Sequence, residues 1–233
     1  MHKILKTSST RWLSLQSVVD RIIEQWVALK YYFVSFELES KDLAHNISSE
    51  MTDENMTYFY FISYILNITN KINIEYQSEE PKIHVLLPTI KIYYKTILSN
   101  FIKREYIDSV DKIDFSNSDF YLEMSEIYIG AKAGILLSKG TLKEEKIKEI
   151  KKVCCAYYAE LCKQISSRID FEDEVLVAVQ SINPKNSVPS LAPLIKVCPH
   201  LIENDIQLQE LDDEWRNFLH QDIVDKNLKL EEF

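Results

Sequence analysis

The densest group of potential acid–base residues in this sequence is an acidic cluster near the C-terminus. The cluster consists of Glu210, Asp212, Asp213 and Glu214. Carboxylates that converge on one point can act as general acids and bases or hold metal ions. These four follow one another along one expected helix, and such a run is typical of a solvated helix face. We therefore predict neither a catalytic site nor a metal site at this cluster.

The cysteines and histidines also lack the spacing of a reactive or metal-binding site. The five histidines are scattered, and no C-x-x-C pair occurs, so we expect no zinc site. Cys155 and Cys162 lie seven residues apart, which places them on one stripe of a helix as small apolar core residues. We also expect no disulfide framework, which indicates a reducing compartment. The complete set of cysteines is Cys154, Cys155, Cys162 and Cys198.

The familiar short motifs of enzymes are missing from the sequence. It contains no G-x-x-x-x-G-K-[ST], G-x-G-x-x-G, H-E-x-x-H or G-x-S-x-G. We therefore predict that the chain is not an enzyme and that it uses no cofactor and no small-molecule substrate.

The composition excludes most folds that contain β-sheets. Three glycines and six prolines punctuate 233 residues, whereas about sixteen glycines would be usual at roughly 7%. Hairpins, bulges and phosphate loops need residues that tolerate positive φ angles. With 46% hydrophobic residues the chain can still fill a core. We predict an all-α fold, an irregular helical bundle, formed by one domain.

The elements of this bundle follow from apolar periodicity and capping signals. We expect the segment 58–68, rich in aromatic residues, to lie in a central helix. Pro88 should kink or split its helix, and Thr141 with Glu144 forms a capping box. Loops are expected at 37–50, 108–119 and 183–189. Helices are expected at 14–33, 53 into the 70s, 81–106, two short pieces within 121–138, 141–169, 170–182, 191–197 and 206–220.

The distribution of charge limits where nucleic acid could bind. Residues 1–33 carry a net +3 and residues 82–198 a net +2, whereas 34–81 and 199–233 each carry −7. The total of −9 argues against a free-standing nucleic-acid binder, and only the first thirty residues are expected to face phosphates. No apolar run reaches the ~18 residues of a membrane span. We expect an intracellular chain without a membrane partner.

Several motifs in a fixed order resemble the hAT superfamily of DNA transposases. The first motif is Thr10-Arg11-Trp12-Leu13-Ser14. The second is the last part of the helix that follows it, residues 24–33 (E-Q-W-V-A-L-K-Y-Y-F). Together the motifs cover nearly the full chain. The later matches are Tyr76 to His84 (Y-Q-S-E-E-P-K-I-H), Asn100 to Lys103 (N-F-I-K), Ile127 to Gly130 (I-Y-I-G) and Leu208 to Arg216 (L-Q-E-L-D-D-E-W-R).

The resemblance implies a place within a transposase, a contact with DNA and a nuclear location. In that family an all-helical insertion interrupts an RNase H-like fold, and three catalytic carboxylates lie outside the insertion. Arg11 and Trp12 match a pair that is implied to contact the transposon end, with the tryptophan stacked on a flipped base. Alternatively, Trp12 packs against the first helix and Arg11 is a surface charge. Trp26 and Trp215 are expected in the core.

These observations predict a non-catalytic fragment of a hAT-type transposase with weak, salt-sensitive contact to DNA. We expect one helical region over 1–233: a strand remnant and helix at 1–35, a helical body at 50–220 and a truncated tail at 221–233. Apolar surface left uncovered, including part of the first helix, should promote self-association or binding of a protein partner. The alternative is a helical protein-interaction module that uses the acidic segment 199–233 or the aromatic helix 58–68.

Overall fold

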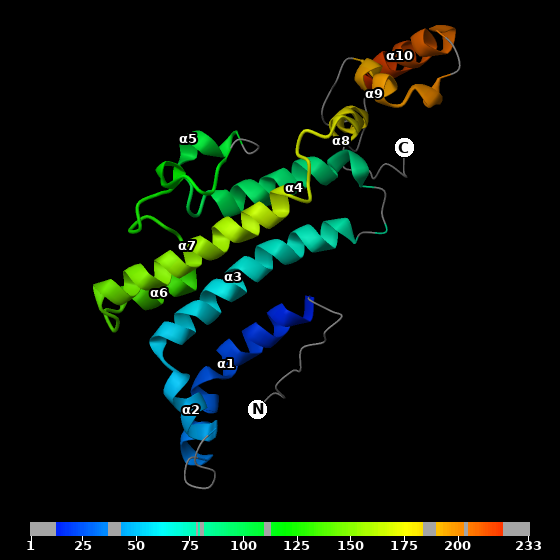
Figure 1. Ribbon diagram of the computed structural model, residues 1–233. Coiled ribbons are helices and arrows are strands. Elements are labelled where there is room, and N and C mark those ends of the chain that lie inside the picture. The colour runs from blue at the N-terminus through cyan, green and yellow to red at the C-terminus, as the bar shows by residue number, and fades with distance from the viewer. Residues whose placement is uncertain are drawn as a thin grey trace. The chain divides into compact units, whose positions relative to one another are not determined.

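The computed structural model describes residues 13–36, 43–77, 79, 82–109, 113–183, 190–202 and 205–220. Within these ranges the chain is built from helices, and an isolated bridge between Ile102 and Tyr121 is the only β-type pairing (Figure 1). The predicted all-α fold is therefore confirmed. The expected strand remnant at the N-terminus and the tail at 221–233 lie outside the described residues. In the described part, no helix is long and apolar enough to cross a membrane.

The described helices fall into two compact units, and each is considered by itself. The first contains the described residues of Met1–Lys71 and Tyr93–Ile165, and the second those of Ile72–Ile92 and Ser166–Phe233. The α-helices are α1 (Leu13–Phe36), α2 (Leu43–Glu50), α3 (Asp53–Tyr76), α4 (Ile83–Leu98), α5 (Arg104–Ile107), α6 (Ala131–Ser138), α7 (Glu144–Ser166), α8 (Glu174–Val179), α9 (Ala192–Val197) and α10 (Asp205–Leu219). Short 3₁₀ helices are Ser118–Phe120, Gln180–Ile182 and Pro199–Leu201.

The core of the first unit forms around α3, as its apolar character on several sides predicts. Phe61 and Ile65 of α3 are buried, and Phe61 meets the ring of Tyr158 on α7 with centroids 5.1 Å apart. Tyr158 also stacks on Phe101 at 5.4 Å. Because large aromatic side chains bury much apolar surface, this cluster is a main source of stability in the unit.

A hydrogen-bonded group fixes the irregular segment before α6. The Tyr64 hydroxyl donates to Asn100 Oδ1 at 3.0 Å, and the Tyr128 amide donates to the Asn100 carbonyl at 2.9 Å. The Tyr158 hydroxyl donates to the Tyr128 carbonyl at 3.0 Å. These bonds satisfy buried polar groups that would otherwise destabilise the core, and they hold residue 128 between α3 and α7.

The structure corrects the predicted boundaries at two segments. Residues 37–50 were expected to form a loop, but α2 occupies 43–50, with Ala44 buried and α1 packed against it. Packing thus overrides the weak helix propensity of this polar sequence. A short helix was also expected after residue 120. Instead the segment 121–130 is irregular, because its backbone bonds to another loop: the Leu122 amide donates to the Phe101 carbonyl at 2.8 Å.

Two signals for helix boundaries do not coincide with a boundary in the structure. Pro88 does not split its helix, since α4 runs from Ile83 to Leu98 through it. The helix after the expected capping box begins at Glu144, so Thr141 lies too early to be its N-cap. The first α7 turn closes with the Ile147 amide on the Lys143 carbonyl at 3.0 Å.

In the second unit, the helix predicted to start at residues 170–173 begins at Glu174, so the acidic residues lie just before it. Asp173 is the N-cap of α8, and its carboxylate accepts the Leu176 amide at 2.8 Å. A side-chain acceptor at this position satisfies one amide that has no partner within the helix. Buried Phe171, Ala178 and Leu191 supply apolar packing in this unit.

Candidate functional site

The residues predicted to contact DNA precede the first helix. Arg11 and Trp12 lie outside the described residues, and α1 begins directly after them at Leu13. The structure therefore describes the helix that follows the pair in the sequence and not the pair itself.

α1 is anchored on α3 by apolar and polar contacts. Val19 and Leu29 are buried, and the ring of Trp26 meets Phe59 with centroids 5.3 Å apart. The Asn70 side chain donates to Gln16 Oε1 at 2.7 Å, near the start of α1. The N-terminal half of the helix is thus held by an amide pair as well as by packing.

The two tryptophans expected in the core are each only half-buried. Trp26 packs edge-on against Phe59, and Trp215 stacks on Phe218 with centroids 5.5 Å apart. Each ring has an aromatic neighbour, which fits a structural role. Neither tryptophan reaches full burial.

The outer side of α1 carries a stripe of exposed apolar side chains. Val27, Tyr31 and Val34 are 65%, 73% and 48% exposed, and their spacing places them on one face of the helix. We call these three residues the α1 stripe. The expected uncovered apolar surface on the first helix is therefore present, mostly in the second half of α1, with Leu15 also 39% exposed near its start.

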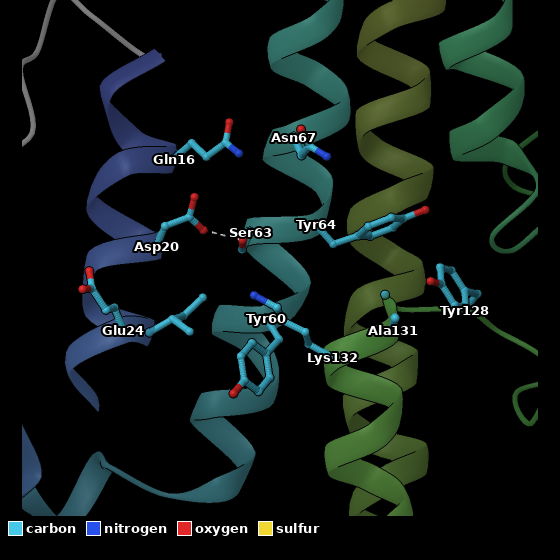
Figure 2. A pocket seen from close by; sticks show the side chains of 12 residues that line it. Gln16, Asp20, Glu24, Tyr60, Ser63, Tyr64, Asn67, Tyr128, Ala131 and Lys132 are labelled. Atoms are coloured by element: carbon cyan, nitrogen blue, oxygen red, sulfur yellow. Dashed lines mark hydrogen bonds between the residues drawn. The ribbon is translucent and has the colours of Figure 1, made fainter. Parts of the chain in front are cut away.

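A pocket of about 540 Å³ lies beside α1, between α3 and the beginning of α6 (Figure 2). Its walls combine carboxylates, tyrosines, amides and one lysine. The main lining side chains are Gln16, Asp20 and Glu24 of α1, Tyr60, Ser63, Tyr64 and Asn67 of α3, Tyr128, and Lys132 of α6.

The charged groups of this pocket already have partners within the chain. The Ser63 hydroxyl donates to Asp20 Oδ1 at 2.5 Å, a bond drawn in Figure 2. Arg21 pairs with Glu24 at 3.3 Å. The Lys132 ammonium lies 6.0 Å from the centre of the Tyr60 ring, within the range of a cation–π contact. We therefore interpret the pocket as a polar seam that joins α1 to α3, since its groups are engaged in structural contacts.

The thiols of α7 are in an environment that suppresses their reactivity. Burial raises the pKa of Cys154 to about 12 and that of Cys155 to about 11. Burial also raises the pKa of Cys162. Because the thiolate is the nucleophile, these thiols are poor candidates for catalysis. Their burial confirms the predicted core position of Cys155 and Cys162.

In the acidic cluster near the C-terminus, Asp212 has structural contacts of its own. It accepts the Ser190 hydroxyl at 2.7 Å and the Leu191 amide at 3.3 Å, and it pairs with Arg216 at 3.0 Å. The Ser190 hydrogen bond is the main reason that the pKa of Asp212 lies below its ordinary value, with the Leu191 amide and Arg216 acting in the same direction.

The other members of the cluster behave as a helix surface. Glu210, Asp213 and Glu214 are exposed. Among the described residues, no three His, Cys, Asp or Glu side chains are grouped as metal ligands would be. The sequence analysis did not predict the hydrogen bond between Ser190 and Asp212. The two residues are 22 positions apart, and no local pattern connects them.

Comparison with known proteins gives no independent indication of ancestry. No protein-family model matches the chain, and searches of curated proteins and of solved structures also find no match. The resemblance to hAT transposases stays a prediction that rests on the motifs themselves.

Proposed function

We propose that this chain is a non-catalytic helical domain derived from a hAT-type DNA transposase, which contacts DNA ends weakly through Arg11 and Trp12. The observation that carries the proposal is the order of motifs from Thr10 to Arg216, which follows that of the family. The all-α architecture agrees with the helical insertion that the resemblance implies.

The anchoring of α1 supports a role for the residues just before it. Gln16 is bonded to Asn70, and Asp20 to Ser63, so the first turns of α1 are held on α3. A binding residue attached to a fixed helix loses less conformational freedom when it binds, and this favours affinity. Trp12 is four residues before Gln16, close to this fixed region.

The charge distribution supports weak rather than strong binding. Residues 1–33 carry +3 within a chain of −9, so few phosphates can be neutralised. Each neutralised phosphate contributes a slope of about −0.9 to the dependence of log affinity on log salt for duplex DNA. A stacked base adds roughly 1–3 kcal/mol through Trp12, nearly independent of sequence.

The absence of catalysis is part of the proposal and is supported by how the acidic residues are used. Asp212 is bonded to Ser190 and paired with Arg216. The positive charge of the Arg216 guanidinium, 3.0 Å from Asp212 Oδ2, disfavours a metal cation at this carboxylate. Asp20 is similarly bonded to Ser63 within the pocket beside α1.

The proposal is tested by DNA binding and cleavage with the purified full chain. Fluorescence anisotropy with transposon-end DNA should give weak binding that falls steeply with salt. Incubation with Mg²⁺ or Mn²⁺ should give no nicked, hairpin or strand-transfer product. Metal-dependent cleavage that co-purifies with the chain and disappears in Asp212→Asn, with folding intact, would contradict the assignment.

A second candidate is a helical module that binds a basic protein partner through α10. Exposed Glu210, Asp213 and Glu214 on this helix favour it. The aromatic helix at 58–68 favours it less, because Phe61 and Ile65 are buried. Replacing the three exposed carboxylates with Gln, Asn and Gln should then abolish salt-sensitive binding of a lysine-rich peptide. Unchanged binding would reject this candidate.

A further inference from the structure

We draw no further inference here: the strongest candidate, the pocket of about 540 Å³ lined by α1, α3 and the start of α6, belongs to the polar seam already described, because its charged side chains Asp20, Glu24 and Lys132 are each engaged with another side chain of the same unit.

Discussion

Gly130 lies directly against Tyr64, and this close contact constrains both the segment before α6 and the wall of the pocket. A Cβ atom added at residue 130 would lie 3.0 Å from both Cβ and Cγ of Tyr64. The backbone at Gly130 has φ of 96°, which L side chains rarely adopt. Glycine is therefore required at this position for two reasons: the positive φ angle of the backbone and the lack of space beside Tyr64.

We predict that Gly130→Ala destabilises the chain by about 2–4 kcal/mol, through backbone strain and overpacking together. The measurement is the free energy of unfolding from urea denaturation. The other glycines are matched controls. Gly140→Ala keeps the strain, at φ of 74°, without the clash, and Gly134→Ala in α6 meets open space. We expect a smaller loss for Gly140→Ala and a gain of about 0.5–1 kcal/mol for Gly134→Ala. Equal effects of all three would contradict the packing at Tyr64.

Asp212 should contribute stability that depends on pH. Its hydrogen bond from Ser190 places its folded-state pKa below the ordinary value of 3.8. A depressed pKa stabilises the fold at pH above the unfolded-state pKa, and the contribution is lost as pH falls through the folded-state pKa. Asp212→Asn should therefore lower the free energy of unfolding at neutral pH, and its difference from the parent should shrink in acid.

The control for Asp212 is Asp213→Asn, which changes an exposed carboxylate that accepts from Gln209. We expect a much smaller effect from this control, because exposed contacts of this kind contribute little. A difference between Asp212→Asn and the parent that stays constant from neutral pH into acid would refute the proposed role of Asp212.

The thiols should react in two separate phases. Cys154, Cys155 and Cys162 are buried, and their pKa values are raised by burial. Cys198 is only partly buried. With a thiol reagent near pH 8, we expect one fast reaction, at Cys198, and three slow ones that require unfolding. The fast phase should disappear in Cys198→Ser. Rapid labelling of all four thiols would show that the α7 core is open.

Local sequence signals predicted several of the helices. Where a prediction from such signals was wrong, contacts between residues distant in the sequence explain the difference. The acidic residues at 170–173 indicated the start of α8 to within four residues, because an N-cap such as Asp173 acts on amides of its own helix. The apolar positions of α3 likewise indicated a buried helix. By contrast, α2 depends on packing against α1, and the segment 121–130 depends on the loop at 100–103. Neither dependence is visible in a local window.

The candidate site was predictable only in part for the same reason. The pair Arg11 and Trp12 came from motif order, and their surroundings lie outside the described residues. The seam beside α1 joins Asp20 to Ser63, which are 43 positions apart. Pairing at that separation follows from how α1 and α3 pack, so residue spacing gives no indication of it.

The most direct test of the central claim measures DNA binding by the parent chain, by Trp12→Ala and by Tyr31→Ala. Each protein is tested with two kinds of DNA end. Anisotropy at low salt is recorded with an intact duplex and with an end that carries an unpaired base. The parent chain should prefer the unpaired end, because stacking needs an exposed base face. Trp12→Ala should lose this preference, whereas Tyr31→Ala, an exposed aromatic at the other half of α1, should keep it. Equal affinity of the parent chain and Trp12→Ala for both DNAs would contradict the account.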